Sequence, residues 1–121
     1  MRLEPLYRIR FAYSESWTVG LDGGWQQLFF MAEGRCEGWV TGRFHGANYP
    51  RKEGVAGPFR PHWRAVVEAG DGAVIMVEWH GYGRACPPER RQIVGAVFHL
   101  ADREPCRRLN DAVCVGEVRT P

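Results

Sequence analysis

A carboxylate, an imidazole and a phenol occupy every second position near the middle of the chain, as Glu78, His80 and Tyr82. Alternate residues of a β-strand point to the same side, so these three groups would share one face. Such groups can transfer protons in a polar cavity, where a neighbouring Arg64 would orient an anionic or carbonyl oxygen. We therefore take Glu78 and His80 as candidate acid–base residues. The alternatives are an ion pair on the outer wall of a sheet and a contact between subunits.

The segment that carries these residues has the pattern of a β-hairpin. Two runs rich in β-branched and aromatic residues flank Gly70-Asp71-Gly72, which is typical of a turn between two strands. A three-residue loop, with Gly72 in the left-handed conformation, fixes the register of the two strands. The pairs predicted on the apolar face are Trp63 with Trp79, Ala65 with Val77 and Val67 with Ile75; those on the polar face are His62 with His80 and Arg64 with Glu78. The apolar row is most simply core, and the sequence leaves open which face lines the interior.

The two indoles of this hairpin would lie at the end farthest from its turn, next to a proline-rich segment that spans residues 48–61. We expect this segment to be a long loop of the kind that often binds ligands. Flat aromatic walls with a few directional polar groups are typical of a small-molecule pocket. The residues predicted to rim its mouth are Tyr49, Trp63, Trp79, Tyr82 and Arg84.

The rest of the chain also predicts short strands separated by turns. Apolar and polar residues alternate over 3–13, and further strands are predicted over 26–33, 35–45, 92–100 and 112–119, with a loop over 14–24 and a turn at Gly34. Seven or eight strands at short intervals are typical of a barrel or sandwich, and closure avoids exposed apolar edges. We expect one domain over residues 1–121, all-β, folded as a single antiparallel barrel.

Composition favours a cytoplasmic protein with a small-molecule ligand. The 16 basic and 14 acidic residues give a net charge of only +2 and are scattered, so nucleic acid is not an expected partner. No run approaches the ~20 apolar residues of a membrane helix, and the first residues lack the features of a signal peptide. We expect no membrane partner and no cofactor. We also expect no metal ion, because no closely spaced cysteine or histidine pair is present.

The cysteines are expected to be reduced. Cys86 is close to Arg84 but has no histidine forced beside it, so it is expected to be an ordinary thiol. Bulky residues that alternate with polar ones, namely Phe29, Met31 and Trp39, predict a homodimer.

Several short motifs, taken together, resemble the family named domain of unknown function 3237. They are Leu3-Glu4-Pro5-Leu6-Tyr7-Arg8, Gly42-Arg43 followed by Gly46-Ala47-Asn48-Tyr49, Asp71-Gly72-Ala73-Val74-Ile75, and Leu109-Asn110 before Val115-Gly116. The resemblance spans nearly the whole chain and implies a calycin-like barrel with a cavity, found at times near natural-product or aromatic-catabolism genes. Asn48 stands where the family has an acid, and Arg108 where it usually has a tryptophan, which indicates a divergent subgroup. The resemblance adds Arg43 and Asn48 to the candidate ligand-binding residues.

Two functional hypotheses follow. In the first, the barrel binds an aromatic or polyketide-like metabolite and acts as a cofactor-independent cyclase or isomerase through His80 and Glu78. In the second, it is a non-catalytic carrier or an accessory subunit of a biosynthetic or catabolic pathway. Polar groups inside the barrel would favour the first hypothesis, and an apolar interior the second.

Overall fold

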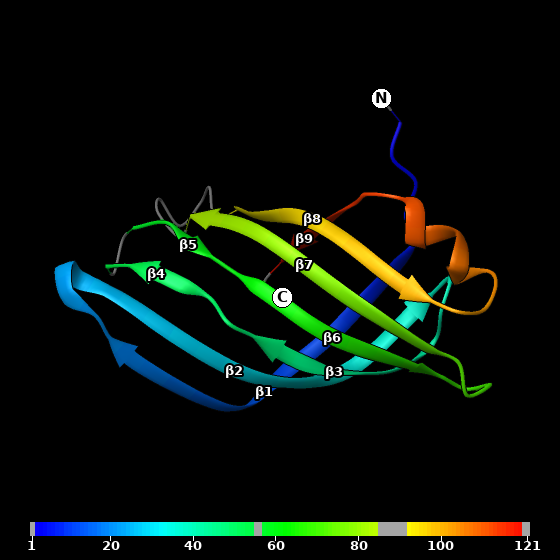
Figure 1. The fold of residues 1–121 in the computed structure, drawn as a ribbon, viewed down its shortest axis with the longest axis horizontal. Coiled ribbons are helices and arrows are strands. Elements are labelled where there is room, and N and C mark those ends of the chain that lie inside the picture. The colour runs from blue at the N-terminus through cyan, green and yellow to red at the C-terminus, as the bar shows by residue number, and fades with distance from the viewer. Residues whose placement is uncertain (1, 55–56, 85–91, 120–121) are drawn as a thin grey trace.

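The chain forms a single antiparallel β-sheet, which the computed structural model describes for residues 2–54, 57–84 and 92–119. Figure 1 shows this sheet as strongly curved, with long strands that cross it obliquely. The described strands are β1 (Tyr7–Gly20), β2 (Trp25–Gly38), β3 (Gly42–Asn48), β4 (Arg51–Glu53), β5 (Phe59–Arg60), β6 (His62–Ala69), β7 (Val74–Arg84), β8 (Gln92–Ala101) and β9 (Cys114–Val118). Two 3₁₀ helices accompany them, η1 (Asp22–Gly24) and η3 (Cys106–Asp111). The predicted all-β fold is confirmed.

The sheet has more strands than the seven or eight predicted because prolines divide two of them. Its order is β5-β4-β2-β3-β6-β7-β8-β9, and β1 pairs with β2. Pro50 separates β3 from β4, and Pro61 separates β5 from β6. Proline has no N–H to give to the ladder, but both carbonyl groups still accept hydrogen bonds, from the N–H of Leu28 and of Gly81, each at 3.0 Å. The segment 48–61, predicted as a loop, therefore contains two short strands of the sheet, β4 and β5.

The central hairpin has the predicted register. Trp63 pairs with Trp79, and on the other face His62 pairs with His80. Gly72 has a φ of 87°, which confirms the left-handed conformation that this three-residue loop requires. Side chains alternate between the two faces of these strands. The apolar row is buried and the polar row is not, so residues of the two rows lie on opposite sides of the sheet.

The first hairpin differs from the prediction. β1 continues through the predicted loop as far as Gly20, with a register shift between Tyr13 and Glu15. β2 likewise passes straight through Gly34, where a turn was predicted. A Cβ atom at Gly34 would lie 1.9 Å from the carbonyl oxygen of Arg10, so this glycine allows close approach of the neighbouring strand instead of a turn. The chain reverses after Gly38, before β3 begins.

The concave side of the curved sheet holds the hydrophobic core, which we call the lumen. Most of its buried residues come from alternate positions of the strands, including both indoles of the hairpin, and Val40 and Cys106 come from outside the strands. They are Ala32, Cys36, Val40, Phe44, Trp63, Ala65, Val67, Ile75, Val77, Trp79, Ile93, Val97 and Cys106. Tyr7, Ile9 and Phe11 of β1 pack against them. The lumen is thus filled mainly with apolar side chains, as is usual for a small barrel.

In the described part of the chain, two strands pair on one side only, and β5, at the end of the strand order, pairs with both β4 and β7. β1 pairs with β2, and β9 pairs with β8. Tyr7 of β1 reaches His99 of β8 inside the lumen, with the two rings edge to face at 5.6 Å. The described residues contain no helix with the length and hydrophobicity needed to span a lipid bilayer. Cys86 and the predicted turn at Pro87-Pro88 lie outside the described residues.

Candidate functional site

The candidate acid–base residues lie on the convex face of the sheet, outside the lumen. The Oε1 atom of Glu78 lies 2.7 Å from Nε2 of His80 and 3.4 Å from Nε2 of His62. The hydrogen bond from His80 lowers the pKa of Glu78, and His62 and Arg64 lower it further, against the opposing effect of desolvation. The side chains of Glu78 and His80 are 42% and 50% exposed. This is the geometry of the outer-wall alternative, in which the carboxylate contacts the two imidazoles at the surface of the sheet.

The other outward-facing candidates are spread over the convex face. The Nε atom of Arg84 donates a hydrogen bond to the Tyr82 hydroxyl oxygen at 3.3 Å. Arg43 forms an ion pair with Glu33 at 3.1 Å, at some distance along the sheet. Tyr49 is exposed, and its ring lies 6.0 Å from that of Phe29. These residues therefore make separate contacts at the surface and do not form one site.

The inward-facing candidates are Trp63, Trp79 and Asn48, all of them buried. Side chains of a strand alternate between its two faces. Tyr82 is three residues after Trp79 on β7, so it points outward while the indole of Trp79 points into the lumen. The five residues predicted to rim one mouth are therefore divided between the two faces. Arg64, predicted opposite Glu78, is paired with it across the strands as expected, with 3.9 Å between its Nη2 and Oε1 of Glu78.

Asn48 joins two strands at the proline break. Its Oδ1 accepts a hydrogen bond from the backbone N–H of His62 at 3.0 Å, and its Nδ2 donates one to the Tyr13 hydroxyl at 3.3 Å. The first bond supplies a partner to a backbone donor directly after Pro61. An amide can both accept and donate in this way, whereas an ionised carboxylate only accepts. Asn48, a predicted ligand-binding residue, is thus used here to hold the fold.

The polar groups inside the lumen that sequence analysis missed are Tyr7 and His99. The hydroxyl of Tyr7 lies 2.5 Å from Nε2 of His99, and His99 is only 3% exposed. Burial holds the pKa of Tyr7 well above its usual range and lowers the pKa of His99. Both side chains are therefore neutral at pH 7. The signal was present in the sequence, because Tyr7 alternates with Ile9 and Phe11, and His99 with Val97.

The neutral state of this pair allows two arrangements of the hydrogens. The hydroxyl of Tyr7 donates to Nε2 of His99, with the imidazole hydrogen on Nδ1, or Nε2–H donates to the Tyr7 oxygen, with Nδ1 left as an acceptor. The Nδ1 atom of His99 is buried and has no hydrogen-bond partner among the described residues, and the same holds for Nε1 of Trp79. Most buried polar atoms of folded proteins do have a partner. The lumen therefore presents two ring nitrogens, on adjacent strands, that have no hydrogen-bond partner among the described residues.

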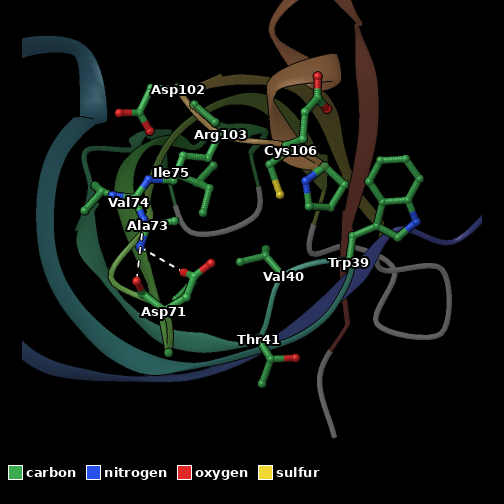
Figure 2. Close-up of a pocket in the computed structure, with 15 residues that line it drawn as sticks. Trp39, Val40, Thr41, Asp71, Ala73, Val74, Ile75, Asp102, Arg103 and Cys106 are labelled. Atoms are coloured by element: carbon green, nitrogen blue, oxygen red, sulfur yellow. Dashed lines mark hydrogen bonds between the residues drawn. The ribbon is translucent and has the colours of Figure 1, made fainter.

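A depression opens at the end of the barrel where β6 turns into β7 (Figure 2). Its volume is about 230 Å³, and Val40, Ile75 and Cys106 contribute to its apolar wall. Burial raises the pKa of Cys106, so its thiol stays protonated and is a poor nucleophile. Exposed charged side chains stand at the rim, three of them acidic and one basic: Asp71, Asp102, Glu104 and Arg103. This rim disfavours an anionic ligand.

His99 belongs to the layer of inward-facing residues directly beneath the depression. Ile75 and Ala101 line the depression and pair with each other, and the next inward pair along the same strands is Val77 with His99. Two residues of a strand span about 6.6 Å. His99, which does not itself line the depression, therefore belongs to the side-chain layer below it.

Aromatic side chains also gather outside the barrel. On the convex face of the first hairpin, Trp17 lies 5.7 Å from Phe29, which in turn contacts Tyr49. Trp17 and Tyr49 are each 52% exposed, and Met31 on the same face is 38% exposed. The third bulky residue singled out in the sequence, Trp39, lies instead beside the depression.

Comparison with known proteins supports the fold. No protein-family model matches the chain, and no curated protein sequence matches it. A solved structure from Acinetobacter baumannii AYE, described as a beta-barrel like protein, superimposes with a TM-score of 0.73 and 18% sequence identity. The match covers 100% of this chain and 93% of the other. At this identity the likeness shows a shared beta-barrel-like fold, and the resemblance to the domain of unknown function 3237 stays a prediction.

Proposed function

We propose that this protein binds a small, neutral, mainly apolar molecule in the depression at the β6–β7 end of its barrel. The observation that carries the proposal is the buried Nδ1 of His99, which has no partner among the described residues and belongs to the side-chain layer beneath the depression. The proposal takes the arrangement in which Tyr7 donates to Nε2 and Nδ1 carries the hydrogen. A ligand whose carbonyl group passes beyond the residues that line the depression, which do not include His99, would supply the missing acceptor. Asp71, Asp102 and Glu104 at the rim favour a ketone, lactone or similar neutral group over a carboxylate.

The size of the depression fits a compact ligand. A cavity of about 150 Å³ in a protein core is large enough to hold benzene. The volume of about 230 Å³ found here therefore suits a molecule of one or two rings. An aromatic or polyketide-like metabolite has this shape and carries the carbonyl groups that His99 would recognise.

The binding function admits a catalytic form, which the Tyr7–His99 pair favours. A phenol hydrogen-bonded to an imidazole can relay a proton to or from a bound carbonyl group, as a cofactor-independent isomerase or cyclase requires. In this form Tyr7 and His99 replace Glu78 and His80 as the acid–base residues, because only the former pair faces the lumen. The carrier form needs only the hydrogen bond from His99. The three described cysteines are unpaired thiols, in keeping with the cytoplasmic location that is part of this proposal.

The test compares two probes that differ by one oxygen. Acetophenone has a carbonyl acceptor, and ethylbenzene has the same ring without it. Binding is measured by the quenching of tryptophan emission and by calorimetry. We expect acetophenone to bind about twofold to tenfold more tightly, which corresponds to one neutral hydrogen bond of about 0.5–1.5 kcal/mol.

Substitutions locate the effect. His99→Leu should abolish the preference for acetophenone, whereas His99→Asn, which keeps an amide donor, should retain part of it. His80→Ala on the convex face serves as the matched control and should change neither affinity. A preference that survives His99→Leu unchanged would disprove the assigned contact. If neither probe binds, the proposal of a binding site in the depression is wrong.

A further inference from the structure

Three groups that bind metal ions meet on the convex face of the central hairpin, on the side opposite to the lumen. They are the imidazoles of His62 and His80 and the carboxylate of Glu78, and their ligand atoms all lie within 4.8 Å of one another. Both imidazoles direct the same nitrogen, Nε2, toward the same oxygen, Oε1 of Glu78. The three donor atoms thus already converge on one small volume.

The backbone of the hairpin holds the two imidazoles side by side. The N–H of Gly81 donates to the carbonyl group of Pro61 at 3.0 Å, which makes these two residues a hydrogen-bonded pair. The next pair, His62 with His80, is therefore a non-hydrogen-bonded pair, the type in which opposite side chains lie closer together. The two ring centroids are accordingly only 4.1 Å apart. The small side chain of Ala96, opposite His80 on β8, leaves the outer side of the imidazole uncrowded.

One nitrogen of this cluster makes only a long contact and no hydrogen bond of good geometry within the described part of the chain. Nε2 of His62 is sealed from solvent and makes no hydrogen bond among the described residues, although Oε1 of Glu78 is 3.4 Å away. The shorter contact of that oxygen, at 2.7 Å, is with His80. A buried nitrogen aimed at two other ligand atoms is a feature that a bound cation would explain, because the ion would accept its lone pair.

We propose that His62, Glu78 and His80 bind one divalent transition-metal ion. Two imidazole nitrogens and one carboxylate oxygen suit zinc, iron, cobalt or nickel, whereas magnesium and calcium prefer sites made of oxygen alone. The same donor set forms catalytic zinc sites and the iron sites of oxygenases, in which three protein ligands leave positions free for water or substrate. The cation nearest to the cluster is Arg64, with 3.9 Å between its Nη2 and Oε1 of Glu78. Its side chain is 76% exposed and is free to turn away into solvent when the ion binds.

The same face offers a matched control. His45 and Glu68 form a pair with 2.9 Å between Nε2 and Oε1, and both are partly exposed like the residues of the proposed site. This pair supplies two ligands in place of three, and it is not part of a metal-binding group among the described residues. Removing His45 therefore changes the number of surface histidines without touching the proposed site.

The experiment is a calorimetric titration of the full chain, freed of metals with a chelator, with zinc chloride at pH 7.5. We expect one ion per chain. His80→Ala and His62→Ala should each weaken binding by at least about tenfold, since loss of even an outer-shell partner of a metal ligand commonly costs 10–100-fold. Glu78→Gln, which keeps the shape of the side chain, should also weaken binding. His45→Ala should leave affinity and stoichiometry unchanged.

Cobalt provides a second readout of the ligands themselves. Its visible absorption bands depend on the donor atoms, so the spectrum of the cobalt-loaded chain should change in His80→Ala and be preserved in His45→Ala. Circular dichroism of each variant checks that the chain is folded. Absence of zinc binding by the wild-type chain, or equal losses in His45→Ala and His80→Ala, would overturn the proposal. Because the site is on the convex face, its failure would leave the proposed function of the depression unaffected, and the reverse also holds.

Discussion

Breaking the pair formed by half-buried Tyr7 and buried His99 should destabilise the fold, whereas replacing both residues together should not. Tyr7→Phe removes the phenolic oxygen and leaves Nε2 of His99 buried without a partner, in a side chain only 3% exposed. An unsatisfied buried group of this kind costs about 1–3 kcal/mol. His99→Leu should cost a similar amount, because the hydroxyl of Tyr7 is then unpaired. In the double variant both polar groups are gone, so its free energy of unfolding should be close to that of the wild type or higher.

Urea unfolding followed by tryptophan emission measures these differences. For a slope of about 2 kcal/mol per molar urea, a loss of about 2 kcal/mol lowers the unfolding midpoint by about 1 M. We expect this shift in each single variant and a much smaller one in the double variant, which should nevertheless lose its preference for acetophenone. Additive losses in the double variant would contradict the reasoning. Such a result would mean that the pair stabilises the native state instead of serving a ligand at some cost to stability.

Three further outcomes are expected. Gly72 has a φ of 87°, so Gly72→Val should destabilise the chain by about 1–3 kcal/mol in the same urea assay, whereas Gly70→Ala, beside open space, should cost less; equal losses would contradict the assigned turn. The pKa of His99 is lowered by burial, so the unfolded chain binds a proton more readily; stability should fall as pH drops below about 6.5, and this part of the pH dependence should vanish in the double variant. The raised pKa of Tyr7 acts in the opposite direction, so stability should also fall above about pH 10. Finally, the exposed aromatic surface of Trp17 and Tyr49 should bury itself in a homodimer, which Trp17→Ser would dissociate; a monomeric mass by light scattering at micromolar concentration, unchanged on dilution, would refute this.

The central hairpin shows what can be predicted from local sequence alone. Its turn residues and its two alternating runs determine the register from Val67 opposite Ile75 to His62 opposite His80, and the structure has these pairs. The reason is that a short turn leaves one register that keeps like residues on one face. The same reasoning failed at Gly34, because a glycine that permits close approach of a distant strand has the same local appearance as one that forms a turn.

The sequence by itself therefore determined the all-β class, the central hairpin and the set of side chains that share each face. Only the tertiary structure decided which face became the lumen, because this depends on the direction in which the whole sheet curves. Because of this curvature, Glu78 and His80 lie on the outside, and Tyr7 of the first strand contacts His99 of the eighth. Contacts of this kind join residues separated by most of the chain, and no local pattern specifies them. The proposed metal site of His62, Glu78 and His80 depended on both. Its strand register could be predicted from the sequence, but the convergence of its three ligand atoms was visible only in the folded hairpin.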